Sequence, residues 1–142
     1  PWQTMANLLE DLAFIRELQP QMIGIGPFIP HHATPLKNYP AGTLEQTLTL
    51  LSVLRLMFPK VLLPATTALG TIVPNGRELG ILAGANVVMP NLSPADVRQN
   101  YLLYDNKLCS GAEAAEAKND LAARLHSIGY EIAEGRGDYK ES

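Results

Sequence analysis

The feature that most constrains the fold is the alternation of helical segments with short apolar runs along the chain. Helical periodicity or capping signals mark the ranges 4–19, 43–58, 75–83, 93–104 and 112–128. The apolar runs between the helices occupy 22–27, 61–67 and 86–89. Because these runs lack the polar alternation of half-exposed strands, they indicate strands covered on both faces. The pattern predicts an α/β chain whose parallel strands are joined by right-handed helical crossovers.

Helix ends are marked by threonines and prolines. Thr4 and Thr43 are suited to cap the helices that follow them, and Pro20 and Pro59 end those helices. The buried stripe of the second helix is expected to contain Leu44, Leu48, Leu51, Leu54 and Phe58. These local signals predict where each helix begins and ends.

The segments between the helices are less regular. Loops are expected at 28–42 and 68–74, and a short last strand at 130–133. Pro64 lies inside the run 61–67, where it removes a ladder donor and normally indicates a strand edge or a bulge. The second strand is therefore expected to be irregular.

Two architectures are built on this plan, a doubly wound open sheet and a (β/α)8 barrel. A barrel normally needs about 250 residues, whereas this chain has 142. We therefore expect the chain to form only the last units of such a barrel, and not to be self-sufficient. Residues 1–134 would form this part, and 135–142 a flexible tail.

Charge and composition argue against several classes of function. The formal net charge of −3 predicts no basic surface for nucleic acid or anionic lipid. No apolar run is long enough to span a membrane. Cys109 is the single cysteine, so the chain can form no internal disulfide and cannot by itself ligate an iron–sulfur cluster. These features favour a cytoplasmic chain.

Polar and proline residues follow the expected strands at their carboxyl ends. The first strand leads into 27–32, the second ends on 66–67, and the third ends on Met89. Tyr101 and Tyr104 follow shortly afterwards. In both candidate architectures ligands bind beyond the carboxyl ends of the strands. The sequence therefore predicts a ligand site at this face, while spacing alone leaves its chemistry open.

These residues also have purely structural explanations. His31 and His32 are adjacent and would point apart in an extended loop, so we do not expect them to bind a metal together. The two threonines are β-branched and common in strands. The methionine could fill a core, and the two tyrosines share a helical face on which they could pack. Either explanation is compatible with the spacing.

Three longer strings carry a more specific signal. They are IGIGPFIPH at 23–31, PATTALGTIVP at 64–74 and GANVVMPN at 84–91. Together they resemble the HydE family of radical S-adenosylmethionine (SAM) maturases of iron-only hydrogenase. More broadly, the chain is similar to the biotin synthase and tyrosine lyase group, whose C-terminal part is the biotin and thiamin synthesis associated region. The resemblance covers roughly residues 3–109.

The resemblance implies a radical SAM (β/α)8 barrel, of which this chain would carry strands six to eight with their helices. It implies an enzyme that cleaves SAM to methionine and a 5′-deoxyadenosyl radical, and that acts on a cysteine-bound iron carbonyl cyanide precursor. The implied cofactors are SAM and one 4Fe–4S cluster, whose CxxxCxxC ligands lie outside this chain. The isolated chain is expected to be inactive without the N-terminal half of the barrel, and to self-associate through its unpaired edges.

Site residues follow from the resemblance only where motif positions match. The residues expected to contact the cofactor are Pro27, Ile29 and Tyr101. Those expected to line the substrate cavity are Thr66, Thr67, Met89 and Tyr104. No catalytic residue and no metal ligand is expected within this chain.

One departure from the family pattern is informative. Some members bind a second iron–sulfur cluster through three cysteines near the C-terminus. Here only Cys109 matches, and 110–116 offers no partner, so a second cluster is not expected. The alternatives that remain are a biotin synthase-like or amino-acid lyase radical SAM enzyme, and a non-catalytic binding module.

Overall fold

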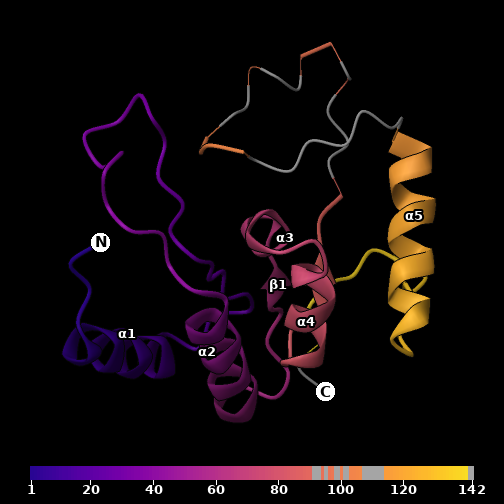
Figure 1. The fold of residues 1–142 in the computed structure, drawn as a ribbon. Helices are drawn as coiled ribbons and strands as arrows, with labels where there is room; N and C mark the ends of the chain where they lie inside the picture. Colours follow the sequence, from indigo (N-terminus) through magenta and orange to yellow (C-terminus); the bar gives the residue numbers. More distant parts are fainter. Residues whose placement is uncertain (91–93, 95, 98–99, 101–102, 107–113, 141–142) are drawn as a thin grey trace.

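The computed structural model describes residues 1–90, 94, 96–97, 100, 103–106 and 114–140. Its helices and strands, in chain order, are α1 (Met5–Leu18), α2 (Leu44–Met57), β1 (Pro64–Ala65), α3 (Thr67–Ile72), α4 (Gly76–Leu82), β2 (Val87–Val88) and α5 (Ala114–Ser127). Figure 1 shows α2 and α4 beside the short strand β1, with α1 and α5 at the two sides.

The strands form a small parallel sheet. Pro64 pairs with Val87 and Ala65 with Val88 in a parallel register. An isolated parallel bridge between Met22 and Leu62 pairs the first apolar run, 22–27, with the second, 61–67. The second run therefore lies between the first and the third. The three expected strand segments therefore lie next to one another in chain order, and the prediction of a mixed chain with parallel pairing is confirmed.

The first two helices begin where the capping residues predict. The Thr4 side chain accepts from the backbone N–H of Asn7, and the Asn7 side chain accepts from the backbone N–H of Thr4, which together form a capping box. The Thr43 hydroxyl accepts from the backbone N–H of Gln46 at 3.2 Å. Each contact satisfies a donor that the first helical turn leaves unpaired.

One arginine joins the ends of two helices. The Arg55 Nε donates to the carbonyl of Gly84 at 2.8 Å, and its Nη1 donates to the carbonyls of Pro59 and Phe58 at 2.8 and 3.2 Å. Burial lowers the pKa of Arg55. Gly84 has φ +117, and a Cβ there would lie 2.7 Å from the Arg55 Cβ. The chain therefore turns after α4 in direct contact with α2.

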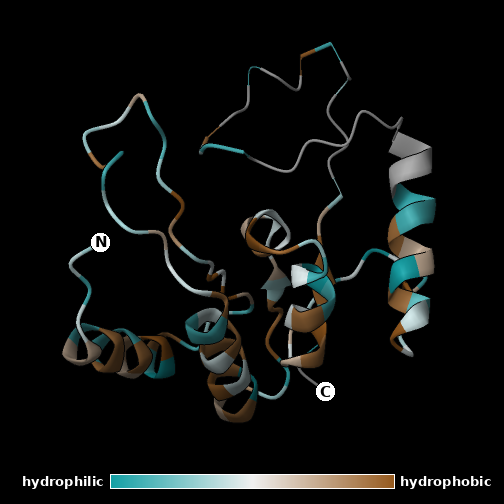
Figure 2. Cartoon of the chain, in the orientation of Figure 1, coloured by the Kyte–Doolittle hydropathy of each residue, from teal (hydrophilic) through white to brown (hydrophobic). Residues whose placement is uncertain are grey.

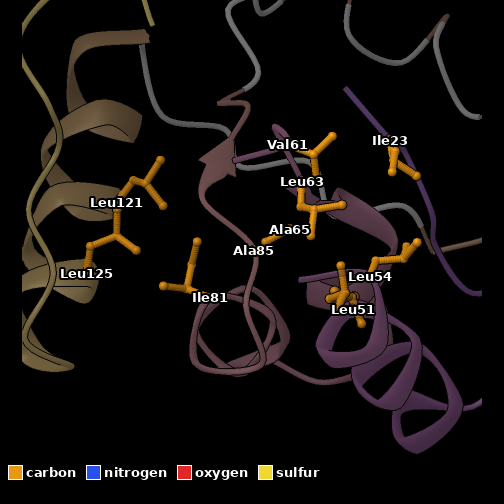
Figure 3. Packing of buried hydrophobic residues seen from close by; sticks show 11 residues of the cluster. Ile23, Leu51, Leu54, Val61, Leu63, Ala65, Ile81, Ala85, Leu121 and Leu125 are labelled. Carbon is orange, nitrogen blue, oxygen red and sulfur yellow. The ribbon is translucent and has the colours of Figure 1, made fainter. Parts of the chain in front are cut away.

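The core lies between the sheet and the helices. Its fully buried side chains are Leu51, Leu54, Leu63 and Leu69. Figure 3 shows leucines of α5 approaching the strand region from one side and leucines of α2 from the other. Burying one leucine fully stabilises a fold by about 1.5–3 kcal/mol, so this layer contributes most to holding α2, β1 and α3 together.

The helix α5 is attached to α4 by apolar and ionic contacts. Leu121 and Leu125 are buried at the edge of the core. The Arg124 guanidinium binds the Glu78 carboxylate through both oxygens, and its Nη2 also donates to the Pro74 carbonyl. Since the Glu78 side chain is only 10% exposed, this carboxylate depends on Arg124 for a charged partner.

The helix α1 covers the core incompletely. It has no fully buried residue, although Leu12 and Ile15 pack against the core. Leu9 and Phe14 are both 61% exposed. In Figure 2 much of the α1 ribbon is brown, the colour of hydrophobic residues. An apolar helix face of this kind is typical of a surface that packs against further protein.

Several expected elements differ in the structure. The run 22–27 keeps only the bridge from Met22 to Leu62, and the strand within 61–67 is limited to Pro64–Ala65. Pro64 has no N–H to donate to the ladder. The expected loop 68–74 contains the helix α3 instead. The expected strand at 130–133 is absent, since no described segment pairs with it. The end of β2 leads into the expected helix 93–104, half of which (93, 95, 98–99 and 101–102) lies outside the described residues.

Candidate functional site

The carboxyl ends of the parallel segments lie at one end of the molecule. Figure 1 shows the loop after residue 27 extending from that end. Gly26 lies against Thr66, since a Cβ on Gly26 would come within 2.9 Å of the Thr66 Oγ1. The ends of the first and second segments are therefore in direct contact, as parallel pairing requires.

The two threonines at the end of β1 differ in their hydrogen bonding. The Thr67 hydroxyl accepts from the Nη2 of Arg77 at 3.1 Å. The Thr66 Oγ1 is buried without a partner among the described residues. A buried hydroxyl without a partner is costly. Thr66 is therefore the residue of this pair best suited to bind a ligand group.

Arg77, in the first turn of α4, is a cation that sequence reasoning missed. Its pKa is lowered chiefly by burial and next by the Arg124 guanidinium. Its Nε has no partner within the described part of the chain. The polar start of α4 at 75–77 was the available signal, but it indicated only a helix cap. A half-buried guanidinium beside the Thr67 hydroxyl provides donors for an anionic or carbonyl group.

Pro27 and Ile29 lie at the base of the long loop and are partly buried. The loop closes there, because the backbone N–H of Gly42 donates to the carbonyl of Phe28 at 2.8 Å. A Cβ on Gly42 would lie 3.2 Å from the Pro27 Cα, so the two ends of the loop are in contact. This base presents backbone and apolar groups, and the expected contact of Pro27 and Ile29 with a cofactor stays a prediction.

The remaining expected site residues are less fully placed. Met89 is 53% exposed and does not fill the core. Tyr104 is half-buried, and the backbone N–H of the next residue, Asp105, donates to the carbonyl of Pro30 at 3.1 Å. The structure therefore brings Tyr104 to the loop of the first segment. Tyr101 lies outside the described residues.

The expectation that His31 and His32 point apart is wrong. Their rings stack with centroids 4.4 Å apart and planes at 24°. The chain turns at this point, because both the backbone N–H and the hydroxyl of Thr34 donate to the carbonyl of His31. In a turn, unlike an extended segment, adjacent side chains can lie on the same side.

A groove of about 450 Å³ lies elsewhere, between α1, the segment 23–26 and α2. It is lined mainly by apolar side chains and contains none of the residues expected at the site. Its position fits the incompletely covered face of α1.

Within the described ranges, no helix is both long and apolar enough to cross a membrane.

The comparisons with known proteins give one consistent result. No family model matches the chain. The [FeFe] hydrogenase maturase subunit HydE of Thermotoga maritima is 50% identical over 109 residues. The 3-methylornithine synthases of Methanosarcina barkeri and Methanosarcina acetivorans are 38% identical over 89 residues and 29% identical over 127.

These matches cover most of this chain but only part of each relative. They extend over 77%, 63% and 89% of the chain, and over 31%, 25% and 35% of the relatives' own lengths. The resemblance to the hydrogenase maturase family is confirmed. The chain is thus a relative of a HydE maturase subunit, to which it is similar over 109 of its 142 residues. It spans about a third of the length of that subunit.

Proposed function

We propose that this chain is part of a radical SAM enzyme that generates a 5′-deoxyadenosyl radical and acts as a HydE maturase for the active-site cluster of iron-only hydrogenase. The observation that carries the proposal is the 50% identity to a HydE subunit over 109 residues. That identity extends over most of a chain whose parallel strand segments end at a common face. This face is where parallel α/β folds bind their ligands.

The proposed architecture is strands six to eight of a (β/α)8 barrel, formed by residues 1–134, with 135–142 as a tail. The neighbouring parallel segments around 22, 62–65 and 87–88 support it. The proposed partner is the N-terminal half of the same barrel. The exposed apolar side chains of α1, including Leu9 and Phe14, support a further layer of protein at that side.

The proposed cofactors are SAM and one 4Fe–4S cluster. The chain has a single cysteine, Cys109, which lies outside the described residues, so its side chains do not fit the ligand set of a cluster. Pro27 and Ile29 do fit an apolar wall for the adenosyl group, and the family resemblance assigns Tyr101 to the same cofactor. When bound, SAM supplies the radical, while these residues orient it and exclude water.

The proposed substrate wall consists of Thr66, Thr67, Met89 and Tyr104. The unpartnered Thr66 hydroxyl can donate to a polar group of the substrate. The Thr67 hydroxyl, already accepting from Arg77, is held in place and keeps its own proton to donate. The proposed substrate is a small organometallic iron precursor. The proposed location is the reducing cytoplasm, in which an iron–sulfur enzyme is stable.

A second candidate is an amino-acid radical SAM enzyme. The similarity to two 3-methylornithine synthases favours this alternative. The Arg77 guanidinium beside Thr67 would suit the carboxylate of an amino acid. A biotin synthase-like reaction and a non-catalytic binding module are the other outcomes that an assay must separate.

The decisive experiment uses the complete parent enzyme, reconstituted with iron and sulfide and reduced in the presence of SAM. Formation of methionine and 5′-deoxyadenosine supports the radical SAM proposal, and their absence contradicts it. Maturation of an iron-only hydrogenase by the parent distinguishes the maturase from the amino-acid enzyme. A rearranged amino acid as the product would instead support the second candidate.

A matched pair of variants tests the substrate wall. Thr66→Val removes the unpartnered hydroxyl, whereas Thr49→Val makes the same change at an exposed position on α2. We expect the first variant alone to lower product formation about fivefold, equivalent to one hydrogen bond of about 1 kcal/mol. Equal activities of the two variants would exclude Thr66 from the substrate wall.

A further inference from the structure

The loop 28–42 and the segment 103–106 are joined by a histidine and an aspartate. The His32 Nδ1 lies 2.7 Å from one carboxylate oxygen of Asp105, and the His32 backbone N–H donates to the other at 2.9 Å. The Asp105 backbone N–H donates in turn to the Pro30 carbonyl at 3.1 Å. The carboxylate is therefore held in a fixed position against the loop.

A third metal-binding side chain lies at the same place. The His31 ring stacks on that of His32, and its Nδ1 accepts from the backbone N–H of Ala33 at 3.1 Å. One potential ligand atom from each of His31, His32 and Asp105 lies within 4.8 Å of the others. The His32–Asp105 contact would form without His31, so the position of the His31 ring is a separate observation.

The three groups are near enough for one cation to bind them after small movements. Tetrahedral Zn²⁺ with ligands at about 2.0–2.1 Å places neighbouring ligand atoms about 3.3 Å apart. His32 and Asp105 are closer than this, as groups sharing a proton are, and would separate slightly when a metal replaces the proton. His31 would move inward. Because the His32 side chain is 77% exposed, such adjustments leave the core untouched.

The donor set is selective. Two imidazoles with one carboxylate suit borderline divalent cations such as Zn²⁺, Co²⁺ or Fe²⁺, and not Ca²⁺ or Mg²⁺, which prefer oxygen ligands. Three protein ligands leave a coordination position open.

We propose that His31, His32 and Asp105 form a binding site for a borderline divalent cation of the Zn²⁺ type. The bound cation joins the loop of the first strand segment to the segment that carries Tyr104. This inference does not depend on the proposed function, because it rests on side chains of this chain alone. Its consequence is a metal-dependent ordering of one rim of the strand-end face.

The test is a titration of the 142-residue chain with Zn²⁺ by calorimetry and with Co²⁺ by visible absorption. Cys109 follows Asp105 closely in the sequence, and a cysteine thiolate can bind metals on its own, so both titrations use the Cys109→Ser chain. We expect one Zn²⁺ per chain and the intense visible bands of four-coordinate Co²⁺. The absence of binding at micromolar metal would overturn the proposal.

Three histidines allow a matched control. His31→Ala and His32→Ala should each weaken Zn²⁺ binding about tenfold or more, whereas His126→Ala, on an exposed position of α5, should leave it unchanged. The His31 variant keeps the contact between His32 and Asp105, so it tests the metal site apart from the loop structure. Undiminished binding by the His31 variant, with circular dichroism unchanged, would also overturn the proposal.

Discussion

Gly76, at the start of α4, is the position where the structure tolerates a side chain least. A methyl group placed on it would lie 2.0 Å from the carbonyl oxygen of Leu69 and 2.4 Å from the carbonyl carbon. Real Cβ atoms essentially never approach such atoms within 3.0 Å, so α3 and α4 must move apart by about 1 Å. The obstacle is backbone, and it cannot rotate away as a side chain would.

We therefore expect Gly76→Ala to destabilise the chain substantially. Leu69 is fully buried, so displacing its carbonyl also disturbs the core. The expected loss is about 3 kcal/mol, at the upper end of the overpacking range. This corresponds to a decrease in Tm of about 6–12 °C for a chain of this size.

The assay is urea unfolding followed by circular dichroism, with Gly24→Ala as the control. Gly24 lies in the apolar run 22–27, and nothing lies within 4 Å of a Cβ there. Its replacement should change the free energy of unfolding by less than about 0.5 kcal/mol. If the two variants unfold at the same urea concentration with the same slope, the close approach of α3 and α4 is not real.

Four further predictions follow. Leu51→Ala should cost about 2–5 kcal/mol in urea unfolding, whereas Leu56→Ala on the same helix, 82% exposed, should cost little. Glu78→Gln should cost about 2 kcal/mol by weakening the pairing with Arg124, and Asp120→Asn, 72% exposed, should be nearly neutral. Sedimentation of the isolated chain should show concentration-dependent self-association, and a well-folded monomer at high concentration would contradict it. Iron and sulfide analysis of the parent should show one 4Fe–4S cluster, and a clear excess would contradict the absence of a second.

Helices were the most predictable part of the fold. The signals for α1 and α2 are local, since Thr4 and Thr43 cap the helices that follow them and the apolar periodicity continues to the end of each helix. The strands were less predictable, because pairing depends on segments far away in the sequence. Pro64 indicated an irregular strand correctly, but only the structure limits the strand to two residues. The range 68–74 was expected to be a loop, but most of α3 forms there.

The candidate site, like the fold, was predictable from the sequence only in part. The sequence indicated that residues after the strands gather at one end, and contacts such as that between Gly26 and Thr66 agree. It could not indicate which hydroxyl lacks a partner, because that depends on Arg77 binding one threonine and not the other. The stacking of His31 was also unpredictable, since it depends on a local turn.

The contacts of Arg55 have a consequence for how this sequence can diverge. A single guanidinium bonds carbonyls from two separate stretches of chain, after α2 and after α4. Lysine would retain the charge at this position, but a single ammonium cannot reproduce donors that are fixed in one plane and point in different directions. Gly84 is constrained in turn, because its φ of +117 and the nearby Arg55 methylene disfavour a side chain. Homologous chains that keep this helix junction should therefore retain arginine and glycine as a pair, or replace both together.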